Sequence, residues 1–137
     1  MIELSALLDP MMMSRLCCLL MLTVLFLQSG LDKVFDRKGN LSWLREHFSS
    51  TPLRNVVPVL LSVITLAEVS AGILSLLGSI MICYDGSLTL GYLGGVLAAL
   101  SVLMLFTGQR LAKDYEGASA LVPYFLLTIL TIIVCGM

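Results

Sequence analysis

The chain has 137 residues, of which 58% are hydrophobic and 12% charged, and its formal net charge is −1. This composition excludes an ordinary soluble domain, and the lack of a basic face, an aromatic stacking series or zinc-ligand spacing argues against nucleic acid as a partner. We therefore predict a single all-α integral membrane domain over residues 1–137: a four-helix transmembrane bundle with a short amphipathic surface helix between helices 1 and 2.

Four apolar runs are long enough to cross a ~30 Å hydrocarbon core, which takes about 20 helical residues. They lie near residues 12–35, 56–83, 88–110 and 119–136. The first should begin after Asp9-Pro10, because aspartate caps a helix and proline fits its first turn. A cleaved signal peptide is the alternative, but acidic residues rather than a basic cluster precede this run and no small-residue cleavage site follows it. We expect a permanent helix.

The connection after the first span carries its own signals. Gly39-Asn40 is expected to break the chain there. The segment 41–48 has apolar residues at spacings of three and four, with Trp43 suited to the headgroup zone, so we predict a short helix lying on the membrane surface. His47 is expected to be a surface residue of that helix.

The second and third spans each carry a stripe of small or polar residues. Such residues let membrane helices approach closely, so both stripes should face the bundle interior. Asp85-Gly86-Ser87 between the two spans predicts a tight turn. The stripe of the second span comprises Thr65, Glu68, Gly72, Ser75 and Ser79, and that of the third Gly91, Gly95 and Ala99.

Basic residues predict the orientation. An even number of spans puts both termini on one face of the membrane, where Arg15 would be the only basic side chain. Because short loops rich in Lys and Arg stay in the cytoplasm, connections 36–54 and 111–118 are predicted to be cytoplasmic and the termini external. The other face carries Lys33, Arg37, Lys38, Arg45, Arg54, Arg110 and Lys113.

The cysteines form no CxxC pair and no metal-like group with the single histidine, so no metal site is predicted. All four map near the external surface. Two interpretations stay open: buried thiols acting as small apolar side chains, or a disulfide or exchangeable thiol pair between helix ends. The possible thiols are Cys17, Cys18, Cys83 and Cys135.

Glu68 is the main candidate for function, because it lies in the middle of the second span with no other charge within ten residues. An ionised carboxylate at the bilayer centre costs roughly 2.5 to 3.5 kcal/mol on insertion scales, so such a residue is usually paired, protonated or functional. Counted from the start of its span, Glu68 lies about 18 Å deep, near the midplane.

Potential partners of Glu68 follow from depth and charge. Gln28 is the expected partner by its depth in the membrane, and Lys33 is the expected partner by its opposite charge. A direct contact between Lys33 and Glu68 would need the two helices to be offset or a water to bridge them. The candidates for ligand binding or proton handling are Glu68, Gln28, Lys33, Asp32, Tyr124 and Arg110. Structural roles are the alternatives: interhelical packing for Glu68, a solvated helix end for Asp32 and Lys33, an interface anchor for Tyr124 and a positive-inside residue for Arg110.

Several of these segments resemble the DoxX family of small four-helix membrane proteins. The similarity lies in FLQSGLDK (26–33) with its Gly30-x-x-Lys33 element, the polar loop with Pro52, EVSAGILSLLG (68–78) opening on Glu68, and the connection that begins at Gly108. The resemblance implies a multi-pass protein of the bacterial inner membrane, linked to quinone-dependent thiosulfate oxidation or to membrane complexes that handle oxidative or thiol stress. The cysteines are not part of the pattern.

Three functions are therefore weighed. The first is an accessory subunit of a membrane redox system, at most a non-autonomous part of an oxidoreductase, with quinone as the possible cofactor. The second is a small proton-coupled transporter that uses Glu68 and works as a homodimer. The third is a structural or assembly protein whose polar groups only pack helices. No Ser/His/Asp set or phosphate-binding glycine loop occurs, so autonomous hydrolysis is not expected.

Overall fold

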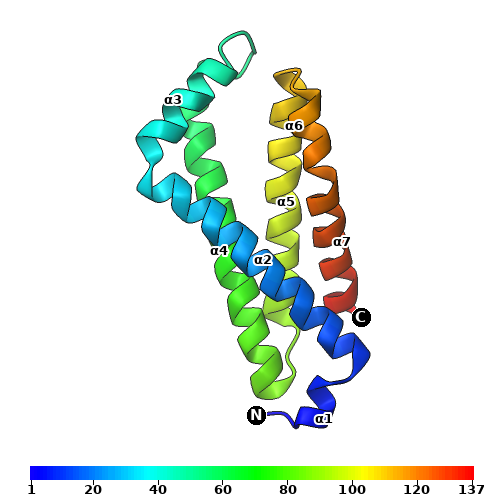
Figure 1. The fold of residues 1–137 in the computed structure, drawn as a ribbon. Coiled ribbons are helices and arrows are strands. Elements are labelled where there is room, and N and C mark those ends of the chain that lie inside the picture. The colour runs from blue at the N-terminus through cyan, green and yellow to red at the C-terminus, as the bar shows by residue number, and fades with distance from the viewer.

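The computed structural model describes residues 1–137 and contains helices but no strands. Four helical segments are long and apolar enough to span a membrane, which confirms the predicted all-α four-helix bundle. They are α2 (Pro10–Phe35), α4 (Val57–Asp85), α5 (Thr89–Leu111), and α6 (Tyr115–Ala120) continued by α7 (Val122–Gly136). Both termini lie at one end of the bundle, and α3 (Arg37–His47) and α6 lie at the other (Figure 1).

The helices pack in the order α2 on α4, α4 on α5 and α5 on α7, while α2 crosses α4 diagonally (Figure 1). The buried positions of α4 recur every three or four residues, from Val57 to Ile82, and include Glu68 and both predicted serines. Because a 3.6-residue period keeps such positions on one face, the predicted stripe does face the bundle interior. Thr65 is its least enclosed member, being only partly buried.

The contact between α4 and α5 is closest at the terminal end. A Cβ on Gly78 would lie 2.5 Å from the backbone nitrogen of Gly91, and one on Gly94 would lie 2.8 Å from the backbone nitrogen of Ser75. These helix backbones therefore touch without side chains between them. The stripe of α5 continues to Ala98, which is fully buried, and the predicted Ala99 lies beside it rather than on it.

Towards the α3 end the same two helices separate (Figure 1). The residue size along α5 explains the divergence, because glycines and alanines give way to the bulky run Leu103-Met104-Leu105-Phe106. Large side chains hold helices further apart than glycines do. The bundle is therefore narrow at the terminal end and open at the other.

The predicted break at Gly39-Asn40 is wrong. The chain bends at Asp36, whose φ of −122° and ψ of 50° lie outside the helical region, and both residues are inside α3. The Asp36 carboxylate accepts a hydrogen bond from the backbone N–H of Gly39, and the Asn40 side chain donates to the Asp36 carbonyl. An N-cap thus starts a helix where the sequence suggested a loop.

The remaining connections are short. Gly86 ends α4 with a φ of 77°, and the Asp85 carboxylate accepts from the backbone N–H of Ser87, which confirms the predicted turn. The fourth span is interrupted at Leu121, just before Pro123 in the first turn of α7. Proline lacks the N–H that a continuous helix would need at that position. An additional short helix, α1 (Leu4–Leu7), precedes the first span.

Candidate functional site

Gly30 sets the distance between α2 and α4. A Cβ at this position would lie 2.7 Å from Val69 Cγ2 and 3.0 Å from the Val69 backbone nitrogen, so only glycine allows the observed approach. Gly72 plays the matching part on α4, where a Cβ would lie 2.7 Å from the Leu27 side chain. Lys33 follows Gly30 by three residues and therefore projects from the same face of α2. The Lys33 side chain therefore reaches Glu68, which precedes Val69 on α4.

Lys33 and Glu68 form a direct ion pair. The ammonium nitrogen of Lys33 lies 3.2 Å from Oε1 and 3.3 Å from Oε2 of Glu68. The residue Glu68 is 0% exposed, whereas 15% of the Lys33 side chain is accessible. The offset required for this pairing comes from the diagonal course of α2 across α4, which brings the end of one helix to the middle of the other (Figure 1).

Ser29 completes the polar group at this crossing. Its hydroxyl accepts a hydrogen bond from Lys33 Nζ at 2.9 Å, and its backbone carbonyl lies at 3.4 Å from the same nitrogen. An ammonium has three N–H donors. The carboxylate and the hydroxyl satisfy two of them well, and the third has only the long contact to the carbonyl. Lys33 can therefore turn this third N–H to another acceptor and give up only the 3.4 Å contact to the Ser29 carbonyl.

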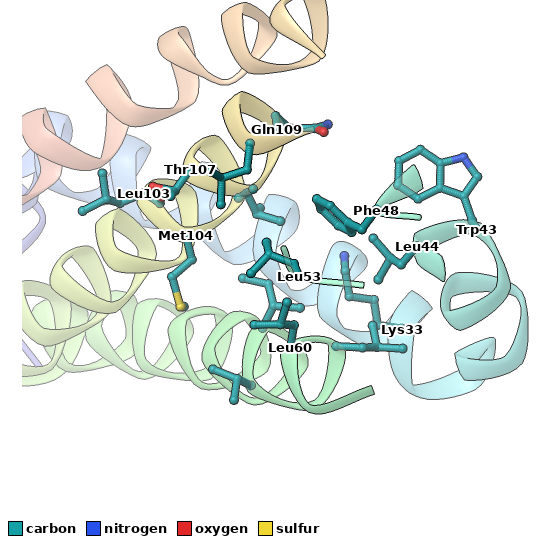
Figure 2. A pocket seen from close by; sticks show the side chains of 16 residues that line it. Lys33, Trp43, Leu44, Phe48, Leu53, Leu60, Leu103, Met104, Thr107 and Gln109 are labelled. Carbon is teal, nitrogen blue, oxygen red and sulfur yellow. The ribbon is translucent and has the colours of Figure 1, made fainter. Parts of the chain in front are cut away.

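A cavity of about 470 Å³ lies beside the ion pair. Twelve of its 16 lining residues are hydrophobic, and Lys33 is the only charged one. In Figure 2, Leu44 of α3 and Phe48, the residue that follows α3, lie beside Lys33 at one end of the cavity, and Met104 of α5 lies at the other end. A volume of this size falls in the ordinary range of small-molecule sites, roughly 300 to 1,000 Å³, and an apolar lining with few polar groups is typical of them.

A polar bridge joins α3 to α5 beside this cavity. The Nε2 atom of His47 lies 2.6 Å from Gln109 Oε1 and 3.8 Å from a carboxylate oxygen of Asp114. Trp43 stacks on the His47 ring at a centroid distance of 4.5 Å, and Phe48 packs under Gly108. The expected surface position of His47 is thus corrected: the residue joins α3 to the ends of α5 and α6.

The other predicted site residues are not brought to Glu68. Gln28 is exposed, because five residues separate it from Lys33 and place it about 140° around the helix. Asp32 is also exposed and accepts a hydrogen bond from Asn40. Arg110 lies over the Tyr115 ring at 4.5 Å, and Tyr124 is exposed on α7 without a hydrogen bond. Only Lys33 and Glu68 of the six candidates meet.

The four cysteines are all free thiols. Cys18 and Cys135 are buried, and Cys135 packs with Leu19 and Ile82 in the core at the terminal end. Cys17 is exposed and Cys83 partly so. The burial of Cys18 and Cys135 agrees with the interpretation of small apolar side chains, and no disulfide joins the helix ends.

Sequence reasoning missed the α5 contribution to the site. Thr107, Gly108 and Gln109 line the cavity, yet in the sequence they read as an ordinary span end. One signal was present: a polar amide in the last turn of a membrane helix needs a partner at that depth. The partner, His47, comes from a segment 62 residues away, so local spacing could not identify it.

Comparisons with protein-family models, with curated proteins and with solved structures find no significant match for this chain. The candidate site therefore stands on its geometry: a buried ion pair at the crossing of α2 and α4, next to an apolar cavity that α3 covers.

Substituting His47 by alanine should loosen α3 from the bundle. The change removes the hydrogen bond to Gln109 and the stacking surface of Trp43, and a net hydrogen bond contributes about 0.5–1.5 kcal/mol. Amide hydrogen exchange in α3 is expected to accelerate up to about tenfold, with little change in α4. Glu46→Ala, an exposed change one residue earlier, is the control. Equal exchange in both variants would contradict the bridging role.

Proposed function

We propose that this chain is a DoxX-like multi-pass protein of the bacterial inner membrane, that it acts as an accessory subunit of a membrane redox system, and that the cavity beside Lys33 and Glu68 binds a quinone-like ligand. The observation that carries the proposal is the combination of an apolar cavity with a single charged lining residue, Lys33, whose third N–H makes only a 3.4 Å contact. A quinone has a flat apolar ring and carbonyl acceptors, which matches that combination.

The charges favour a neutral ligand. Glu68 balances the charge of Lys33 within 3.3 Å, so the site as a whole offers hydrogen bonds rather than an uncompensated positive charge. Carbonyl oxygen accepts such a bond from an ammonium at about 2.7–2.9 Å. Reduction of a bound quinone to the quinol takes two electrons and two protons. The electrons would come from a partner subunit and the protons from water, and Lys33, which lines the cavity, would pass protons to the ring carbonyl while Glu68 holds its ammonium in place.

The direct ion pair also favours a second candidate, in which the two residues only fix α2 against α4. Both ideas require Lys33 and Glu68, so changing the pair alone does not separate them. A variant that narrows the cavity without changing the pair separates the two ideas, because a purely structural role of the pair does not depend on the cavity volume.

The test is the amount of quinone that copurifies with the protein from bacterial membranes in a mild detergent, measured by extraction and chromatography. Met104→Trp places a larger side chain in the cavity wall and is expected to lower retained quinone about tenfold, the effect of roughly 1.4 kcal/mol of lost binding free energy. Lys33→Met is expected to do the same by removing the donor.

The matched control is Leu100→Trp, one helical turn away on α5. Leu100 is 49% exposed, against 41% for Met104, but does not line the cavity. Its quinone content should equal that of the unchanged protein. If no preparation retains quinone, or if both tryptophan variants retain it equally, quinone binding in this cavity is wrong and the structural role of the pair is favoured.

A further inference from the structure

One wall of the cavity opens between α4 and α5. Val63, Leu103 and Met104 line the cavity, and they are 46%, 48% and 41% exposed, respectively. All three belong to membrane-spanning helices, so their outer surfaces face the hydrocarbon region. The divergence of α4 from α5 above their small-residue contact produces this opening (Figure 1). The cavity therefore communicates sideways with the membrane interior.

Polar and aromatic contacts hold α3 at the aqueous end of the cavity. The His47–Gln109 hydrogen bond joins α3 to α5, and buried Phe48 packs against Gly108. Trp43 and Leu111, which line the cavity at this end, are 55% and 44% exposed. A ligand dissolved in the bilayer instead meets the side chains of Val63, Leu103 and Met104. Their apolar side chains would pack against a hydrocarbon chain but would form no hydrogen bonds with a polar one.

We propose that the ligand is a quinone with a long alkyl or isoprenoid tail, that its head lies at Lys33, and that its tail passes between α4 and α5 into the bilayer. This inference rests on the function proposed above and adds the class of ligand and its path. A phospholipid also has apolar tails, but its phosphate would need free positive charge. Glu68 already neutralises the only charged residue of the cavity wall, so the uncharged head of a quinone fits better.

Trp43 provides a built-in reporter, because it is the only tryptophan of the chain and it lines the cavity. The experiment places the full chain in phospholipid nanodiscs and measures quenching of Trp43 fluorescence by two benzoquinones. One carries a decyl tail, and the other has the same head without a tail. Concentrations are expressed as mole fraction within the bilayer, so that simple partitioning of the tailed compound does not count as binding.

The tailed quinone is expected to quench saturably, at one equivalent per chain, with an affinity about tenfold higher than that of the tail-less compound. The double variant Val63→Phe/Met104→Phe narrows the opening and should abolish this advantage, so that the tailed quinone then binds no more tightly than the tail-less compound. The matched control is Leu66→Phe, an exposed position of α4 that does not line the cavity, and it should behave like the unchanged protein.

The outcomes separate the two proposals. Equal saturable binding of both quinones, unaffected by the double variant, overturns the tail path and leaves quinone binding intact. Absence of saturable quenching by either compound overturns both. Saturable quenching of Trp43 by a phospholipid with brominated chains, not reversed by the tailed quinone but abolished by the double variant, identifies a lipid as the occupant and also overturns the inference.

Discussion

Replacing Lys33 by methionine is expected to lower the free energy of unfolding by about 3–5 kcal/mol, the range found when one partner of a buried ion pair is removed. The reason is the position of its partner: Glu68 is fully buried in the middle of α4 and has no hydrogen-bond donor other than Lys33. The measurement is reversible unfolding in mixed micelles followed by circular dichroism, with Lys38→Met, an exposed lysine of α3, as the control.

The reverse change, Glu68→Gln, should cost less, about 1–3 kcal/mol. Part of the Lys33 side chain is accessible through the cavity, and its flexible stem can carry the ammonium towards the headgroup region. The double variant Lys33→Met/Glu68→Gln should lose less stability than the sum of the two single losses, by more than about 1 kcal/mol. The reason is that neither charge is then left without its partner. Strict additivity, or equal losses for Lys33→Met and Lys38→Met, would show that the pair does not stabilise the α2–α4 crossing.

Gly78→Leu is expected to destabilise the bundle by about 3 kcal/mol or more, at the upper end of the range for overpacked cores. The added Cβ alone would lie 2.5 Å from the backbone nitrogen and 2.6 Å from the Cα of Gly91. Backbone atoms cannot move aside as a flexible side chain can, so α4 and α5 must separate. The loss would appear as a lower unfolding midpoint in the same mixed-micelle assay.

The control for this change is Gly136→Leu. A Cβ at Gly136 would meet only the Tyr92 ring, at 3.5 Å, which is an ordinary van der Waals distance. Its effect should stay within about 0.5 kcal/mol, as for most surface substitutions. A similar loss in both variants would mean that a leucine is unfavourable at any glycine of this chain and that the close contact of α4 with α5 is not the cause.

The sequence by itself determined the class of the protein, the number of spans and the helix faces that pack. Apolar runs of sufficient length leave no alternative to membrane helices, because backbone groups in lipid must be satisfied within the segment. The spacing of small and polar residues on α4 placed Glu68 in the bundle interior, since the helical period fixes which positions share a face. Boundaries were less certain where capping decides them, as the start of α3 after Asp36 illustrates.

Only the tertiary structure decided which residues meet. Depth along two uncrossed helices favoured Gln28 as the partner of Glu68. However, α2 crosses α4 diagonally, and Gly30 brings the backbones together one turn before Lys33. The cavity likewise depends on the divergence of α4 from α5 and on the bridge from His47 to Gln109. Crossing angles and contacts between distant segments arise from the packing of whole helix surfaces, and local spacing along one helix does not contain them.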